Sequence, residues 1–502
     1  MVEVSKRQAE KDESEKGEIT TAEDVTFVAD RKRTQFVMNT ANMIDNADGQ
    51  LYPSVYPQIQ SSMHLSLDQL GLITSIQTIL QSITTPIWGF WNDTHSRKKV
   101  LTFGLFLWGI FTIATAFSLH YIDMLVYRAI VGLGLACIIP TTSSVIADYF
   151  PAKSRGKAFG WLGLTQVLGV AFGTIFATLV VQITPTILGM ESWRFVFVVW
   201  GVISIGIGFF VWGLSKDPVR GLMDPGSTGL GLELAENHKV SWADYKEIIT
   251  NKTFLVIILQ GLIGSMPWNA ILFMVTWFEY IGFGPLIAGL IFVVIALGNA
   301  FGNLCGGLIG DRAAKWKPNS GRVLMAQISR LAGIPLVFVI FFIIPRTTAS
   351  IGLYVLIGAI TGFMTAWPSN STNFPIFSEI FEPEIRGSVY SIDRVFEGTF
   401  QSLGSVFVSL VATAYGFLTP PPNTLLINLP SAFLATNASA LAFGMLWVCM
   451  IPWIISLALY TFLYFTYPKD FQTMHNLLEA RARVDEQGAG REETGTEASR
   501  EF

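Results

Sequence analysis

The sequence predicts an all-α integral membrane protein with twelve transmembrane helices in two pseudo-symmetric six-helix bundles. Three observations support this: the composition, the length of the apolar blocks, and two patterns that recur in the second half. Of 502 residues, 51% are hydrophobic and only 14% are charged, whereas soluble domains carry about 25% charged residues. The mean hydropathy is +0.48. The apolar blocks run to roughly 20 residues, long enough for a helix to cross a bilayer core of ~30 Å.

The two recurring patterns lie at matching places in the two halves. The charged loop from Gly89 to Lys99 is echoed from Gly307 to Lys315, with the same glycine-to-acid spacing and an offset of 218 positions. The stretch from Asp148 to Gly156 is echoed from Glu379 to Gly387, with an offset of 231 positions. In both copies an acid and an aromatic residue precede an Arg-Gly pair. Two independent echoes indicate two copies of one membrane unit.

Twelve spans follow from the apolar blocks. They are expected at 34–56, 68–90, 99–118, 122–146, 157–181, 194–214, 253–279, 286–310, 321–345, 350–378, 388–415 and 440–466. The N-terminal bundle then covers 31–214 and the C-terminal bundle 253–467. Residues 1–30 form a tail that is expected to be disordered, and residues 468–502 form a second charged tail. The linker at 215–252 ends in a stretch, Trp242 to Ile249, with the pattern of a short amphipathic helix.

The distribution of basic residues predicts the orientation in the membrane. One set of loops carries most of the bases: Arg97, Lys98, Lys99, Lys153, Arg155, Lys157, Arg312, Lys315, Lys317, Arg322 and Arg386. The opposite loops carry only Arg346. Because cytoplasmic loops are enriched in lysine and arginine, the first set is expected to be cytoplasmic, together with both termini and the linker. The sequence does not distinguish the plasma membrane from an organelle membrane.

The charged loops also carry a family resemblance. The loop after span 2, with Gly89, Asp93, Arg97 and Lys98, resembles the signature loop of the major facilitator superfamily, and Arg128 to Gly134 resembles its second motif. Within that superfamily the chain is most similar to the Spinster-like branch. The supporting stretches are Asp45–Asp48, Arg128–Gly134, Ile146–Phe150 and Asp393–Gly398. The resemblance implies an alternating-access secondary carrier, in that branch one for lysophospholipids or sphingoid lipids. Leu135 stands where the branch has a glutamate.

Among the charged residues that fall inside spans, five are the candidates for ion coupling: Asp45, Arg128, Asp393, Arg394 and Glu397. Each charge is costly in a bilayer and therefore needs a reason. Asp45, Arg128 and Glu397 fall at similar depths, because each lies 8–12 residues from a span end at 1.5 Å per residue. The alternatives are a structural Asp45–Arg128 pair and a self-neutralised cluster in span 11. With Leu135 in place of the glutamate, Asp45 is the first candidate for a titrating group and Glu397 the second.

The repeated acids and bases predict a gate at the cytoplasmic side. In the first half Arg97 is placed to bridge Asp93 and Asp148, and Asp93 faces the helix start at Arg386. The mirrored set in the second half is Asp311, Lys315 and Glu379. Ion pairs of this kind are weak one by one, which suits a latch that breaks in each cycle. The alternative is that these bases only fix the topology.

Broken helices predict the substrate path. Proline occupies corresponding places in the two halves: Pro140 in span 4, and Pro368 and Pro375 in span 10. Hydroxyl side chains follow Pro140, and a run of hydroxyl and amide side chains lies between Pro368 and Pro375. Proline frees a backbone carbonyl that a polar partner or a cavity must satisfy. The alternative is a kink that serves only the rocking of the halves. The candidates for substrate contact are Asn42, Trp268, Asn269, Trp367 and Asn370.

The function predicted from these features is proton-coupled transport of a small organic or lipid-like amphiphilic molecule by a monomer among membrane lipids. One alternative is a receptor or sensor that keeps a carrier fold without transporting. Another is a facilitative carrier for a polar organic anion or a sugar. The five histidines are scattered, and no phosphate-binding Gly-Lys-Ser/Thr loop is present. We therefore expect no enzyme activity, metal, cofactor or nucleic-acid partner.

The predicted orientation is testable by cysteine labelling. The native cysteines, Cys137, Cys305 and Cys449, all lie in apolar runs. A membrane-impermeant reagent added from outside should label Leu425→Cys and miss Leu230→Cys in intact cells. The reverse labelling pattern would overturn the topology.

Overall fold

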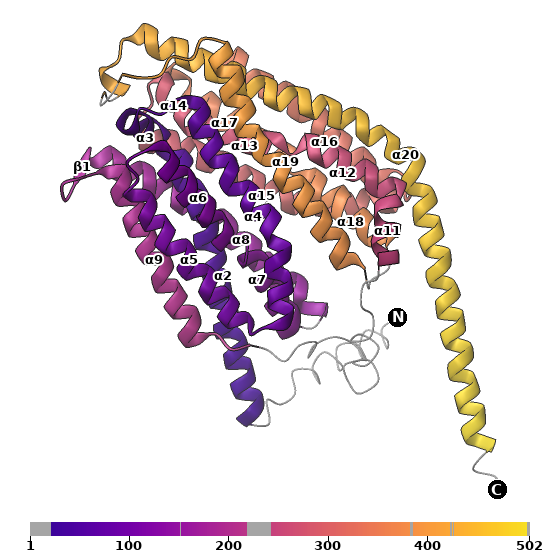
Figure 1. Ribbon diagram of the computed structural model, residues 1–502. Helices are drawn as coiled ribbons and strands as arrows, with labels where there is room; N and C mark the ends of the chain where they lie inside the picture. Colours follow the sequence, from indigo (N-terminus) through magenta and orange to yellow (C-terminus); the bar gives the residue numbers. More distant parts are fainter. Residues whose placement is uncertain are drawn as a thin grey trace, which may run out of the picture.

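The computed structural model describes residues 22–150, 152–217, 242–381, 385–421, 424 and 426–498. Figure 1 shows two helical bundles side by side, the first in indigo to magenta and the second in pink to yellow. The start of α2 and the end of α20 both point to the bottom of this view. We call this the basic end, because Arg97 and Arg322 begin helices there, and we call the opposite side the far end.

The N-terminal bundle contains six membrane crossings. Its elements are α2 (Ala22–Ser54), α3 (Tyr56–Met63), α4 (Leu67–Thr94), α5 (Arg97–Ala116), α6 (Tyr121–Leu135), α7 (Ile138–Tyr149), α8 (Ala152–Ile183), β1 (Thr186–Ile187), β2 (Met190–Glu191) and α9 (Ser192–Leu214). The strands form a small antiparallel hairpin in which Thr186 pairs with Glu191. The fourth crossing is broken between α6 and α7, four residues before Pro140, where a proline ring disfavours the helix.

The C-terminal bundle contains six further crossings. Its elements are α11 (Trp242–Thr250), α12 (Lys252–Gly264), α13 (Met266–Ala270), η1 (Ile271–Phe273), α14 (Met274–Ile281), α15 (Pro285–Trp316), α16 (Gly321–Phe338), η2 (Val339–Ile343), η3 (Thr348–Ser350), α17 (Ile351–Thr365), η4 (Ser369–Asn373), α18 (Phe374–Ile380), α19 (Arg386–Ala414), η5 (Leu426–Asn428) and α20 (Ser431–Ala498). The helix α11 confirms the predicted short helix before span 7. The predicted break in span 10 is a wide turn, η4, between Pro368 and Phe374.

Ten helices in the described ranges are long and apolar enough to cross a membrane. The remaining two crossings are α2 and α4, with 33 and 28 residues. The low hydropathy of α2 has a clear cause, because Asn42, Asp45, Asn46 and Asp48 lie within two turns. These polar groups mark the helix as one that faces other helices and not lipid.

Two predicted boundaries differ from the structure. Helix α2 begins at Ala22, so residues 22–30 are helical where disorder was predicted. Helix α20 continues through Pro452 and Pro468 to Ala498 without the predicted change to a separate tail. The predictions for residues 1–21, for most of the linker and for labelling positions 230 and 425 fall outside the described residues.

Close helix crossings in each bundle depend on glycine. In the first bundle, α5 and α9 cross at Gly109 and Gly201, and a Cβ on Gly201 would lie 2.6 Å from the Gly109 carbonyl oxygen. In the second bundle, Gly298 and Gly302 lie against the backbone of α17, where added Cβ atoms would come within 2.3 Å of carbonyl oxygens. Small residues at such spacings let membrane helices pack backbone to backbone.

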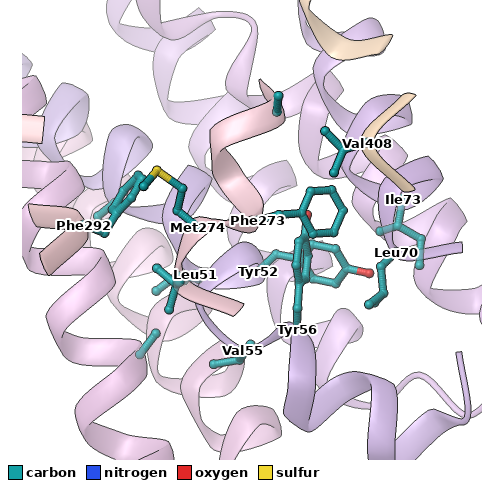
Figure 2. Close-up of a cluster of buried hydrophobic side chains, with 14 of the residues drawn as sticks. Leu51, Tyr52, Val55, Tyr56, Leu70, Ile73, Phe273, Met274, Phe292 and Val408 are labelled. Atoms are coloured by element: carbon teal, nitrogen blue, oxygen red, sulfur yellow. The ribbon is translucent and has the colours of Figure 1, made fainter. Parts of the chain in front are cut away.

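The two bundles are joined at the far end by a cluster that we call the far-end seal. Figure 2 shows its apolar part, in which Tyr56 of the first bundle lies beside Phe273 of the second. Their ring centroids are 5.1 Å apart. The other labelled members are Leu51, Tyr52, Val55, Leu70, Ile73, Met274, Phe292 and Val408. All of these side chains are buried, so the seal removes a continuous apolar surface from solvent.

Hydrogen bonds between the bundles surround this apolar cluster. Gln58 donates to Glu279 at 3.3 Å, and the Tyr280 hydroxyl donates to Gln60 at 3.4 Å. Deeper in the interface, Ser75 donates to the Ser402 carbonyl at 2.6 Å. The seal therefore combines apolar contact with hydrogen bonds in which at most one partner is charged. Breaking such hydrogen bonds costs only a modest free energy.

The α5–α9 crossing generates a stability prediction. Gly201→Ala should lower stability by about 1–3 kcal/mol, because the new methyl group overpacks the crossing. Gly206→Ala is the matched control in the same helix, since a Cβ there meets nothing within 4 Å. The control should be neutral or slightly stabilising because alanine is the better helix former. Melting temperatures in detergent compare the two; equal values would contradict the packing argument.

Candidate functional site

The first group of buried charges is centred on Arg128 of α6. Its Nη2 donates to Gln77 Oε1 of α4 at 2.6 Å and to Asp48 Oδ2 of α2 at 3.4 Å. The guanidinium also lies over the rings of Tyr52 and Phe197, at 5.5 and 5.6 Å from their centroids. Arg128 and Asp48 are 1% and 0% exposed. This arrangement ties three helices together just below the far-end seal.

Arg128 therefore does not form the structural pair with Asp45 that was one of the alternatives. The partner is Asp48, three residues further along the same helix, which the sequence analysis quoted in a motif but did not assign. Positions i and i+3 share a helix face, so spacing alone does not choose between the two acids. The depth predicted for Arg128 was not sufficient to distinguish them, because one turn of helix is only 5.4 Å.

Asp45 instead faces the space between the bundles. It is buried but slightly accessible, at 8% exposure, and it lies within Coulombic range of Asp48 and of Arg394. Arg394 belongs to α19 of the other bundle and is exposed, although it lies eight residues inside a membrane-spanning helix. An exposed guanidinium at that depth indicates a polar space beside it, since lipid would not solvate the charge.

The second group of buried charges lies in the C-terminal bundle. Asp393 and Glu397 are one helical turn apart on α19, within Coulombic range of each other and of Arg394. Among the described residues, neither acid forms an ion pair within 4 Å. The alternative of a self-neutralised cluster, with Arg394 bonded to Glu397, is thus not formed in this conformation. The charged side chains of this group therefore interact electrostatically without forming a close ion pair.

Arg330 is a member of this group that sequence reasoning missed. It lies on α16, buried, with its guanidinium 5.4 Å from the centroid of Trp453. Glu397 and Tyr460 are its electrostatic neighbours, and Tyr460 donates to Asn373 of the wide turn η4 at 3.0 Å. The signal was present in the sequence: Arg330 lies nine residues, or ~14 Å, inside span 9.

At the basic end of the first bundle, Arg97 and Asp148 form a buried ion pair. Arg97 is the first residue of α5 and Asp148 is near the end of α7, as the gate prediction requires. Next to them Asn92 donates to Thr141 at 2.8 Å. The side chains of Asp93 and Arg386 lie outside the described part of the structure, so their predicted contact stays a prediction.

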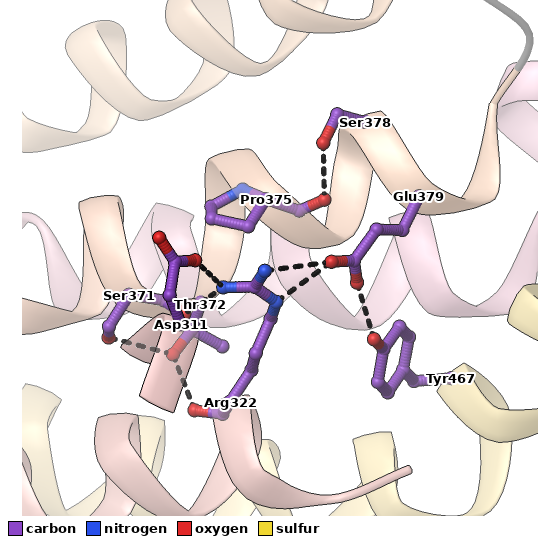
Figure 3. A network of polar contacts seen from close by, with 8 residues as sticks. All are labelled: Asp311, Arg322, Ser371, Thr372, Pro375, Ser378, Glu379 and Tyr467. Atoms are coloured by element: carbon purple, nitrogen blue, oxygen red, sulfur yellow. Dashed lines mark hydrogen bonds and ion pairs between the residues drawn. The ribbon is translucent and has the colours of Figure 1, made fainter. Parts of the chain in front are cut away.

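The matching site in the second bundle uses a different base from the one predicted. Figure 3 shows Arg322 between two carboxylates, 3.1 Å from Asp311 and 2.9 Å from Glu379. Glu379 also accepts a hydrogen bond from Tyr467. Lys315 forms no ion pair with a described residue. Arg322 and Arg97 are true counterparts, because each lies in the first turn of the third crossing of its bundle.

The error over Lys315 has a structural cause. Arg97 follows Asp93 by four residues, whereas Arg322 follows Asp311 by eleven. Helix α15 runs on to Trp316, and a turn then leads into α16. The second copy therefore contains a longer loop, and counting from the acid reached a lysine on the extended helix.

The candidates for substrate contact have mixed outcomes. Asn42 donates to the Leu162 carbonyl and to Thr165, so it fastens α2 to α8 and is not free for a substrate. Trp367 is buried against α15, where its Cα would lie 2.9 Å from a Cβ on Gly306. Both assignments are thus better explained by helix packing.

Two of the remaining candidates stay near the centre. Asn269 accepts from Gln401 at 3.1 Å and keeps a buried Nδ2 without a partner among the described residues. Trp268 is half-buried beside it. The side chain of Asn370 lies outside the described residues.

Comparison with known proteins decides the family. The sequence model of the family described as Major Facilitator Superfamily matches residues 38–405, well over half of the chain. The chain belongs to the major facilitator superfamily. As a member, it is an integral multi-pass membrane protein and a secondary transporter of small molecules.

The predicted resemblance to the Spinster-like branch is confirmed. Protein spinster of Drosophila melanogaster is 25% identical over 223 residues, which cover 44% of this chain and about a third (34%) of that protein. The probable L-galactonate transporter of Escherichia coli (strain K12) is 23% identical over 397 residues, covering 72% of this chain and 84% of the transporter.

Solved structures share the fold. A bacterial homologue of the human lysosomal transporter Spinster, in an inward-facing and unoccupied conformation, aligns with a TM-score of 0.75 and 19% identity, over 88% of this chain and 98% of that one. A D-xylose–proton symporter aligns with a TM-score of 0.60 and 15% identity, over 83% and 96% of the two chains.

The Arg322 network generates a prediction about the latch in the second bundle. Arg322→Gln should cost about 2 kcal/mol of stability, because it removes charged hydrogen bonds and leaves two acids uncompensated. Adding Glu379→Gln should cost less than the sum of the single changes, since the two residues interact. The readout is the melting temperature in detergent.

Lys315→Gln is the matched control, since that lysine is exposed and makes no such contact. It should change stability by no more than about 0.5 kcal/mol. A control that destabilises as much as Arg322→Gln would restore Lys315 as the bridging base.

Proposed function

We propose that this transporter moves a small amphiphilic molecule with an anionic or zwitterionic head by alternating access, coupled to protons. The observation that carries the proposal is that Asp45 and the exposed Arg394 lie within Coulombic range of each other. Each belongs to a different half of the molecule, and the halves of this superfamily move relative to each other during transport. The electrostatic attraction between them therefore depends on the conformation.

Arg394 is the better candidate for the substrate's anionic group. Arg128, which the sequence suggested, already holds Gln77 and Asp48, so it has little capacity left for a ligand. Arg394 is exposed and has no described ion-pair partner within 4 Å. A guanidinium recognises a carboxylate or phosphate through paired hydrogen bonds. The half-buried Trp268 supplies apolar surface for a chain.

The relatives are consistent with such a range of substrates. Their names include an L-galactonate transporter, a citrate exporter of Aspergillus niger and a D-xylose–proton symporter. Two of these substrates are organic anions, which supports the anion part of the proposal. It also supports the second candidate function, a facilitative carrier for a polar organic anion.

The coupling role falls to Asp45. Protonation of this acid changes its attraction to Arg394, and a substrate anion on Arg394 competes for the same charge. A proton on Asp45 and an anion on Arg394 thus favour each other's binding, which is the requirement for symport. Glu397 is the reserve, because it stands in the corresponding group with Asp393 and Arg330.

The basic end is proposed to face the cytoplasm. Arg97 with Asp148, and Arg322 with Asp311 and Glu379, then form paired latches on that side. The far-end seal closes the opposite side. Alternating access requires the two closures to weaken in turn, and neither rests on one strong bond.

The proposal is tested by uptake into proteoliposomes. The panel contains lysophospholipids, sugars and organic anions, each with and without an inward pH gradient. Saturable, gradient-stimulated uptake of an anionic or zwitterionic amphiphile supports the proposal. Uptake of a sugar or a short organic anion without a response to the gradient would establish facilitative carriage in its place, and binding without uptake of any compound would identify a receptor.

The coupling role generates a separate prediction. Asp45→Asn should abolish accumulation driven by a pH gradient but leave downhill exchange partly intact, because the substrate site on α19 remains. Asp123→Asn is the control, since that acid lies at the far-end start of α6. If Asp45→Asn still concentrates substrate, Asp45 is not the coupling residue. Glu397→Gln in the same assay then tests the reserve.

A further inference from the structure

The far end of the C-terminal bundle contains a cavity separate from the central charges. It has a volume of about 480 Å³, within the range of small-molecule sites. Its walls come from the end of α14, the wide turn η2, the residues after it and the first turns of α20. Phe342, Ile343, Arg346, Leu434, Ala435 and Ser439 are the lining residues that matter below.

The cavity contains Arg346, the single base of the predicted far-end loops. Arg346 donates from Nη1 to the Ser439 hydroxyl at 2.9 Å and from Nη2 to the Phe341 carbonyl at 3.0 Å. Its Nε is buried with no partner in the described part of the chain. No described carboxylate lies within 4 Å. The guanidinium is thus held in place by neutral groups, and its charge is left for something else.

A second arginine at the far end shows the contrast. Arg194 has the Glu191 carboxylate 2.7 Å from its Nε, and its Nη1 donates to the carbonyls of Ala116 and Ser118. Its charge is paired and it closes a turn of the first bundle. Arg346 is likewise hydrogen-bonded to neighbouring groups, but it has no carboxylate in the place that Glu191 takes beside Arg194.

One side of the cavity wall is apolar and continues onto the outer surface of the bundle. Phe342 and Ile343 are 53% and 57% exposed, at the end of a membrane-spanning helix. They belong to the π-helical turn η2, and such turns are frequent at functional sites. The site therefore places an uncompensated cation at the membrane boundary beside an apolar wall.

We propose that this cavity binds the phosphate-bearing headgroup of an anionic membrane lipid, with an acyl chain lying along Phe342 and Leu434. The cation and the hydroxyl of Ser439 suit a phosphate, because guanidinium groups bind phosphate oxygens in pairs. The apolar wall suits the chain, and a lipid reaches both at once from the bilayer. This site does not depend on the transported substrate or on its coupling to protons.

The experiment uses the full-length protein in a neutral detergent, titrated with phosphatidylglycerol. The melting temperature should rise with lipid concentration, as for any ligand that binds only the folded state, and native mass spectrometry should detect retained lipid. Arg346→Gln should lose most of both effects, and Arg346→Lys should keep part of them. Arg194→Gln is the matched control and should respond like the wild type.

Two further arms keep the proposal falsifiable. Ala435→Trp fills the cavity from an exposed position and should abolish lipid retention, even if Arg346→Gln does not fold. Phosphatidylcholine and soluble glycerol phosphate should stabilise the wild type much less than phosphatidylglycerol. Equal stabilisation by phosphatidylcholine, equal stabilisation by glycerol phosphate, or undiminished lipid retention in Ala435→Trp would each overturn the proposal.

Discussion

The cost of a charge in a bilayer is the constraint on which this molecule depends. Arg128 meets it with partners from three other helices: an acid, an amide and two aromatic rings surround its guanidinium. Breaking such a group would leave an uncompensated charge in a dry interior, at a cost of several kcal/mol. The first bundle is therefore held as one body by its own buried pair, and the far-end seal rests on the same helices.

The second bundle treats its charges differently. Asp393, Arg394, Glu397 and Arg330 are gathered within Coulombic range, yet the described structure shows no ion pair among them. Part of their stabilisation must come from water, substrate or the opposite bundle. The buried ion pair thus makes the first bundle rigid, whereas the unpaired charges of the second bundle are able to respond to a ligand or a proton. This asymmetry exists although the sequence repeats and the paired latches show a common plan.

Much of this was predictable from the sequence, for identifiable reasons. Hydropathy predicted the membrane crossings. The repeated motifs predicted that Arg97 pairs with Asp148, and that Asp311 and Glu379 belong to one site in the second bundle. Residue spacing predicted the wrong partner in two situations. Asp45 and Asp48 lie one helical turn apart, so spacing did not distinguish them as partners of Arg128. A longer loop in the second half placed Arg322, and not Lys315, beside Asp311. Asn42 and Trp367 are polar and aromatic enough to suggest a ligand, but only the packed structure shows that neighbouring helices already occupy them.

The unbroken course of α20 has a mechanical consequence. Its 68 residues correspond to roughly 100 Å of helix, whereas the bilayer core accounts for only ~30 Å. The remainder projects beyond the basic end as a rod fixed to the C-terminal bundle (Figure 1). A rod of this length acts as a lever arm. A rotation of the bundle by a few degrees, barely visible at its centre, sweeps the tip through several ångströms of the surrounding solution.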